Sequence, residues 1–158
     1  MRTNEQNRAK FAYDAILEVK SDKSDIQKKY SSYVKSAPVL ILSNGLPSTL
    51  AFYLSKMKLK DSTKYTDIKS EIDKYRASKP NKFENKSERV AYAYLFYHIS
   101  WWLAEKANNG RGLTNGKDPL KFMLEEADVF KVIQLTRESI ALLNWMRRFA
   151  DAMLEKEE

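Results

Sequence analysis

Apolar residues recur at helical spacing along almost the whole chain. Phe11, Ala12, Ala15, Ile16 and Val19, for example, follow one another at steps that place them on one face of a helix. Similar stripes continue downstream and are separated by short polar breaks. The pattern predicts helices over residues 4–20, about 25–42, 47–58, 64–78, 86–108, 118–127 and 128–155.

This pattern predicts an all-α fold, a single compact bundle of six to seven helices that spans residues 1–158 as one domain. A chain of 158 residues suits one hydrophobic core. The apolar run 39–42 is short enough to be a buried strand instead. Because the chain offers no second strand to pair with it, a helix kinked or restarted at Pro38 is the preferred interpretation.

The expected helix ends carry residues that cap helices. Asn44 and Gly45 suit the end of the second helix, where a glycine can take a positive φ without a Cβ clash. Leu46 and Phe52 are then expected to dock the third helix on the core. Side-chain caps are expected from Thr3 with Gln6, Ser24 with Gln27, Asn85 with Glu88, and Asp118 ahead of Pro119.

The helix at 86–108 is expected to be the centre of the fold. Six aromatic residues lie within residues 92–102 and are spread around the helix, so several of its sides should be buried. Residues 79–86 form an expected basic loop, and residues 109–117, with three of the four glycines, form another. The aromatic residues could stack on bases if exposed, but a role in the core is favoured.

Composition removes several classes of chemistry. There is no cysteine, which excludes disulfides, thiolate metal sites and a cysteine nucleophile, and the single His98 excludes a histidine cluster for zinc. We expect no metal and no cofactor. His98 is expected to be a packed, hydrogen-bonded residue, because no orienting acid lies close to it on its own helix. A small all-α enzyme with a site around His98 and Tyr97 remains an alternative.

Membrane insertion is not expected. The apolar runs, such as residues 38–42, are far too short to span a bilayer. The first ten residues are polar and lack the apolar stretch of a signal peptide. We therefore expect a soluble, cytoplasmic protein.

Positive charge is concentrated in the first part of the chain. The net charge is +7, and residues 1–90 carry 19 basic and 11 acidic residues. Such a surface attracts polyanions such as nucleic acid, although it could also be an ordinary solvated surface. The residues expected to contact phosphate oxygens or a partner's acidic surface are Lys28, Lys29, Lys35, Lys56, Lys58, Arg137, Asn144, Arg147 and Arg148.

A DNA- or RNA-binding protein of another kind is also possible. A helix-turn-helix module could use residues 44–45 as its turn. The helix that follows, however, has too few polar side chains to read base edges in a groove.

Two segments of the sequence are similar to a known family. They are LILSNGLPSTLAFYLSK at 40–56 and TRESIALLNWMRRFA at 136–150. Together, and in this order, they resemble the small all-helical subunit of the type III-B CRISPR RNA-silencing complex, the Cmr complex. The chain departs from the family pattern at Ser139-Ile140 and Met146, where Ala-Leu and Leu are expected. Between the two segments the resemblance extends only to helical, aromatic character.

The resemblance implies a role without catalysis in antiviral defence. In that family, small subunits stack into a short filament beside the RNA-bound backbone subunits and line the groove where guide RNA pairs with target RNA. Target cleavage belongs to the backbone subunit, and the nuclease and cyclase activities belong to the large subunit. The implied partners are those two subunits, further copies of this chain, guide RNA and target RNA.

Overall fold

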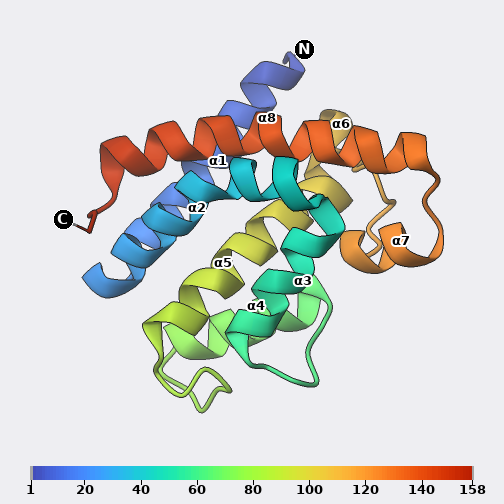
Figure 1. Ribbon diagram of the computed structural model, residues 1–158. Coiled ribbons are helices and arrows are strands. Elements are labelled where there is room, and N and C mark those ends of the chain that lie inside the picture. The colour runs from blue at the N-terminus through green and yellow to red at the C-terminus, as the bar shows by residue number, and fades with distance from the viewer. Residues whose placement is uncertain (1, 158) are drawn as a thin grey trace.

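The computed structural model describes residues 2–157, and its helices follow the predicted ones closely (Figure 1). A π-helical turn, η1, interrupts the central helix. The elements are α1 (Asn4–Lys20), α2 (Ser24–Asn44), α3 (Leu46–Met57), α4 (Tyr65–Arg76), α5 (Ser87–Trp101), η1 (Trp102–Lys106), α6 (Ala107–Gly110), α7 (Pro119–Glu125) and α8 (Val129–Met153).

The expected all-α fold is confirmed. Within residues 2–157 there is no strand, and there are seven helices when η1 and α6 are counted as a continuation of α5. The apolar run 39–42 is helical, and Pro38 lies buried inside α2.

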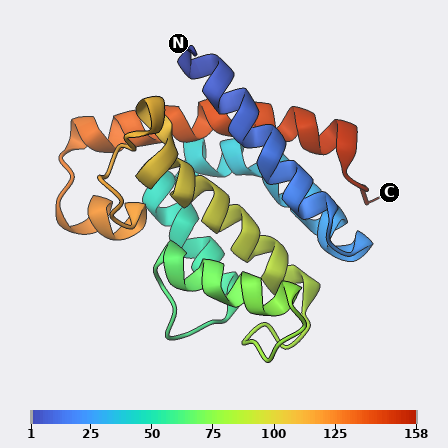
Figure 2. The ribbon, with the colours of Figure 1, turned by 180° about the vertical axis from the view of Figure 1, so that it is seen from behind.

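Helix α8 lies across α1 and α2, and α3, α4 and α5 extend away from it (Figure 1). Figure 2 shows α1 and α5 from the other side, with α4 beneath α5. Every residue from Val90 to Ser100 is buried, so α5 is the central helix that its aromatic content predicted. Other helices cover this apolar helix on several sides, which keeps its surface from water.

Two of the expected caps are confirmed and two are wrong. Thr3 and Gln6 form a full capping box, and the Asp118 side chain accepts from the backbone N–H of Lys121. Helix α2 begins after Lys23 and α5 after Lys86, neither with a side-chain cap. The reasons are local. Gln27 donates instead to two backbone carbonyls of the α1–α2 turn, and Asn85 has φ 56°, unlike the extended backbone of an N-cap residue.

The α2–α3 turn depends on Gly45. This residue has φ 89° and ψ 155°, a region of backbone space that is essentially restricted to glycine. The turn brings Leu46 into the core as expected, but the expectation for Phe52 is wrong, since it is 41% exposed. Leu50 and Tyr53 are buried with Leu46 because they share its helical face, whereas Phe52 points away from that face.

A buried polar network joins four helices around His98. The Nε2 atom of His98 lies 2.8 Å from Oε1 of Glu18 on α1, and Nδ1 lies 2.9 Å from the hydroxyl oxygen of Tyr30 on α2. Because a carboxylate only accepts, Nε2 donates to Glu18, and Nδ1 shares a hydrogen bond with the Tyr30 hydroxyl. Glu18 also pairs with Arg76 of α4 at 3.1 Å. One imidazole thus ties α5 to α1 and α2, and through Glu18 to α4.

The ionised form of Glu18 is favoured in the folded protein. Burial would raise the pKa of its carboxyl group, but the hydrogen bond from His98 and the positive charges of Lys69 and Arg76 outweigh this, so the pKa is lowered. The lowered pKa means that ionised Glu18 stabilises the fold at neutral pH.

Gly45→Val tests the strained turn. We expect it to lower the free energy of unfolding by more than about 1 kcal/mol, because valine is forced into a glycine-only conformation. The added Cβ has only an ordinary contact with Pro47, at 3.9 Å, so the effect is conformational rather than steric crowding. Thermal melting measures the change. Ser43→Val, at an exposed helical position, is the control, and equal midpoints for the two variants would contradict the assignment.

Glu18→Gln tests the network through its pH dependence. At pH 7 we expect a loss of about 1–3 kcal/mol, the usual range for a hydrogen bond to a charged group. Below the folded-state pKa of Glu18 the wild-type carboxyl is itself protonated, so the difference between the two proteins should shrink as the pH falls toward 3. Thermal midpoints across pH 3–8 measure this.

Asp14→Asn is the matched control, because Asp14 pairs with Lys10 on the exposed side of the same helix. It should change the midpoint little at any pH. A difference between Glu18→Gln and the wild type that stays constant from pH 3 to pH 8 would contradict the role given to the ionised carboxylate.

Candidate nucleic-acid and partner interface

The nine residues expected to contact RNA or a partner come from three parts of the fold, and none is fully buried. Three lie on α2, two lie at the end of α3, and four lie on α8. The last four are all exposed and lie outside the buried stripe of α8. By element, the residues are Lys28, Lys29 and Lys35; Lys56 and Lys58; and Arg137, Asn144, Arg147 and Arg148.

Three of these cations meet where α8 crosses α2. Lys35 of α2 and Arg147 and Arg148 of α8 line one shallow hollow of about 280 Å³, together with Ser31 and Asp151. We call Lys35, Arg147 and Arg148 the α2–α8 cluster. It exists because the two helices cross, since Lys35 lies more than a hundred residues before the two arginines in the sequence.

The α2–α8 cluster keeps an excess of positive charge. Asp151 forms an ion pair with Lys156 at 2.7 Å, and this hydrogen bond and charge, with a smaller contribution from Lys35, lower the pKa of Asp151. The guanidinium of Arg148 lies 5.6 Å from the ring centre of Trp145, which supports the side chain from one side. The hollow therefore presents cations to solvent, an arrangement that suits phosphate oxygens.

Arg137 lies in different surroundings. It precedes Arg147 by ten residues, which is about 15 Å along the helix. It lines a separate hollow of about 650 Å³ with Phe130 and Ile133, and with Arg8 and Glu138. The lining of this hollow includes apolar side chains, whereas that of the α2–α8 hollow does not, so Arg137 does not belong to the α2–α8 cluster.

The lysines of α2 and α3 are also dispersed. Lys28 precedes Lys35 by seven residues and lies on the same side of α2, about 10 Å away along the axis. Helix α3 begins beside α8 and runs away from it, so its last turn, with Lys56, is far from the cluster (Figure 1). The Lys56 ammonium lies 5.5 Å from the ring centre of Phe52. Lys56 and Lys58 therefore form no single patch with the α8 residues.

A patch of exposed apolar side chains was not predicted. Leu124 at the end of α7 and Val129, Phe130 and Ile133 at the start of α8 are all exposed, Phe130 by 77%. We call these four residues the α7–α8 patch. A signal was available in the sequence, because the three α8 residues lie outside the stripe of Leu135, Leu142 and Met146. Large apolar side chains gathered on a surface are typical of a protein interface.

His98 is the packed, hydrogen-bonded residue that was expected. Its side chain is 0% exposed and both ring nitrogens have partners within the protein. The sequence did not identify Glu18 as the orienting acid, because it lies 80 residues away. Tyr97 is also buried, and burial raises the pKa of its hydroxyl. A substrate finds no free nitrogen at this histidine, so the geometry gives the enzyme alternative no support.

Two further observations concern the part of the chain that the structure describes. Residues 2–157 hold no group of three histidine and acidic side chains placed to bind a metal ion. None of the described helices combines the length and the apolar character that crossing a bilayer requires.

Comparison with protein-family models identifies the family of the chain. The family described as CRISPR-associated protein (Cas_Cmr5) matches residues 4–153, from the first residue of α1 to the last residue of α8. The match covers the 59–135 region as well as the two segments whose sequence resembled the Cmr small subunit. The chain therefore belongs to the Cmr5 family, the small subunit of type III-B CRISPR-Cas complexes.

Proposed function

We propose that this chain is a non-catalytic structural subunit that stacks with its neighbours in the Cmr complex and lines the groove holding guide RNA paired to target RNA. Its protein partners are the backbone subunit, the large subunit and further copies of itself. Family membership supports association with other Cmr subunits. The contacts with RNA and the stacking are the proposed part.

The α2–α8 cluster is the observation that carries the RNA contact. Lys35, Arg147 and Arg148 converge from two helices on one hollow, and the nearby carboxylate of Asp151 is already paired with Lys156. A guide–target duplex offers closely spaced phosphates and a shape rather than accessible base edges. Converging cations without a deep pocket fit that kind of recognition.

The α7–α8 patch supports the stacking. Phe130 and its apolar neighbours lie beside Arg137, and interfaces are enriched in aromatic residues and arginine. We therefore assign Arg137 to a neighbouring subunit rather than to RNA. Burying Phe130 against a second protein would remove the largest exposed aromatic side chain of this surface from water.

The absence of catalysis is part of the proposal. His98, the single histidine of the sequence, is hydrogen-bonded to Tyr30 and Glu18 inside the protein. The exposed surface offers charge and apolar area, which are the requirements of a subunit that binds and spaces others.

Reversing the charge of the α2–α8 cluster tests the RNA contact. The triple variant Lys35→Glu/Arg147→Glu/Arg148→Glu should fold normally, because all three side chains are exposed. In a reconstituted complex it should weaken target RNA binding. The slope of log affinity against log salt concentration should fall by about one for each phosphate that the variant no longer neutralises.

The matched control is Lys20→Glu/Lys79→Glu/Lys86→Glu, which makes the same change in net charge at three exposed lysines elsewhere. If both triple variants weaken target binding equally, general charge rather than the cluster is responsible. An unchanged affinity and salt slope in the α2–α8 variant would contradict the proposed contact.

Phe130→Glu tests the stacking. The substitution places a charge in the proposed interface and should weaken incorporation of the chain into the complex at least tenfold, as expected for a central aromatic contact. Leu17→Glu, at an exposed position on α1, is the control. Native mass spectrometry of the assembled complex measures subunit occupancy. Full occupancy with the Phe130 variant would show that this patch faces solvent in the assembly.

A further inference from the structure

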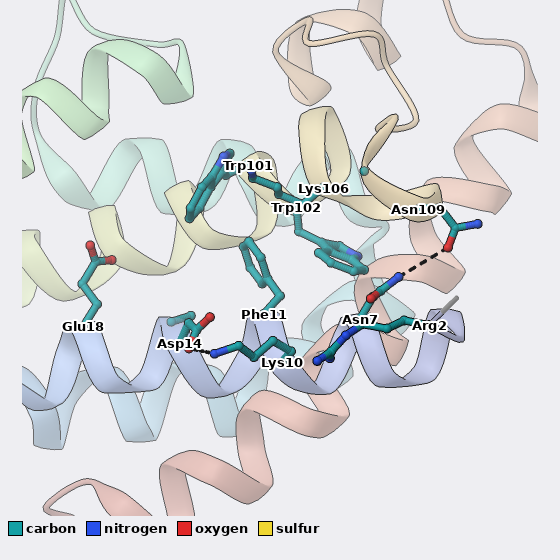
Figure 3. Close-up of a pocket in the computed structure, with 12 residues that line it drawn as sticks. Arg2, Asn7, Lys10, Phe11, Asp14, Glu18, Trp101, Trp102, Lys106 and Asn109 are labelled. Carbon is teal, nitrogen blue, oxygen red and sulfur yellow. Dashed lines mark hydrogen bonds and ion pairs between the residues drawn. The ribbon is translucent and has the colours of Figure 1, made fainter.

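A hollow of about 710 Å³ lies between α1 and the segment formed by the end of α5, η1 and α6. Its floor is aromatic (Figure 3). Phe11 of α1 packs against both tryptophans of the central helix, with ring centres 5.1 Å from Trp101 and 5.0 Å from Trp102. We call this hollow the tryptophan pocket. It shares no lining residue with the hollow of the α2–α8 cluster.

The two adjacent tryptophans differ in what they can do. Trp102 is buried, and its Nε1 donates to Glu138 at 3.0 Å, so it is a fixed wall. Trp101 is only half-buried, and Tyr97 stacks on it with the rings 5.3 Å apart and nearly parallel. Trp101 therefore offers a ligand in the pocket an indole ring that Tyr97 holds in place.

Charge at the rim is positive once the internal ion pairs are considered. Of the acids, Asp14 is paired with Lys10 at 2.9 Å, and Glu18 is engaged by His98 and Arg76. The remaining cations are those of Arg2 and Lys106.

Among residues 2–157, no carboxylate lies within ion-pair distance of Arg2 or Lys106. The Lys106 ammonium instead lies 5.3 Å from the ring centre of Trp101. Its side chain is exposed, so it can leave the ring without exposing buried surface. The pocket thus combines an aromatic floor with two cations that are free to bind an anion.

Two amide side chains complete the rim. Asn7 of α1 donates to Asn109 at 3.3 Å across the mouth of the pocket (Figure 3). Each amide carries both a donor and an acceptor, and one weak mutual hydrogen bond leaves most of that capacity unused. These groups can bond the edge of a flat heterocycle that lies on the floor.

We propose that the tryptophan pocket binds one unpaired nucleotide of single-stranded RNA. The base stacks on Trp101 in the place that the Lys106 side chain now occupies, and Asn7 and Asn109 bond its edge. Lys106 and Arg2 bind the flanking phosphates. This site goes beyond the proposed function, in which the α2–α8 cluster contacts the backbone of paired RNA.

The chemistry of the pocket favours a nucleotide over other ligands with a flat or apolar group. A cationic ligand would be repelled by Arg2 and Lys106, because the acids of the pocket, Asp14 and Glu18, are already paired. A neutral apolar ligand would leave Arg2 and Lys106 unused. Stacking combined with phosphate contacts is the usual way in which proteins hold single strands without strong sequence preference.

The test uses the purified full chain and a fluorescently labelled single-stranded hexamer of adenosine, with affinity measured by anisotropy. A hexamer of the same length and charge that consists of abasic sites is the comparison ligand. Trp101→Ala should weaken binding of the adenosine hexamer about tenfold and leave binding of the abasic hexamer unchanged, because only a base can stack. Trp101→Phe should restore part of the loss.

Three further variants separate the possible outcomes. Tyr13→Ala removes an exposed aromatic side chain from α1 outside the pocket and is the matched control. The double variant Arg2→Glu/Lys106→Glu changes only exposed side chains, so it tests the pocket even if Trp101→Ala fails to fold, as judged by thermal melting. It should weaken binding of both hexamers. The α2–α8 triple variant should retain the dependence on the base, so failure of the pocket and failure of the duplex-binding surface are distinguishable.

The proposal is overturned if the wild-type chain binds the two hexamers equally. It is also overturned if the folded Trp101→Ala variant keeps full affinity for the adenosine hexamer, or if the double variant binds as the wild type does. A poly-glutamate peptide that binds as tightly as the adenosine hexamer and depends equally on Trp101 would show that the pocket takes acidic protein segments, which also overturns it.

Discussion

The buried hydrogen-bonded chain Tyr30–His98–Glu18 is the contact on which the arrangement of the helices depends. It places one imidazole between two other helices, and Glu18 extends the connection to Arg76 on a fourth. Apolar contacts alone tolerate small shifts between helices, whereas a fully satisfied buried polar chain has one good geometry. Removing one partner would leave a buried polar group without a hydrogen bond, which lowers the free energy of unfolding. The single histidine is thus better explained by a structural role, in which its hydrogen bonds fix the helices relative to one another, than by a catalytic one.

Much of the fold could be predicted from the sequence because helix formation leaves a periodic signal. The stripe of α1, the breaks around Gly45 and the aromatic composition of α5 are local features, and the structure confirms each of them. The caps predicted at Ser24 and Asn85 were wrong because they were inferred from local spacing alone. Spacing can identify a candidate capping residue. Whether the cap forms also depends on competing hydrogen-bond partners that spacing does not reveal, such as the backbone carbonyls to which Gln27 donates.

The candidate surface could be predicted only in part. Exposure followed from the periodicity of α8, but the meeting of Lys35 with Arg147 depends on how two distant helices cross, and no local pattern encodes that crossing. Arg137 is equivalent to Arg148 by its spacing alone, and the apolar surroundings given by Phe130 distinguish the two. The resemblance to the Cmr small subunit provided the biological context. The structure separates the α2–α8 cluster, the α7–α8 patch and the tryptophan pocket, and their assignment to duplex RNA, a neighbouring subunit and a single base is our proposal.

The packing of α8 on α1 has a consequence for how the protein is made. Arg8 binds Glu138 through two hydrogen bonds of 2.8 Å, and Trp145 donates to Glu5 at 2.7 Å, so residues more than 125 positions apart in the chain hold the first and last helices together. Closing so large a loop costs entropy that only the completed contact repays. During synthesis, the part of α1 that packs on α8 therefore stays uncovered until α8 has left the ribosome. Folding is completed only after translation has reached the last helix, which makes the nascent chain, rather than the finished subunit, the form most exposed to aggregation.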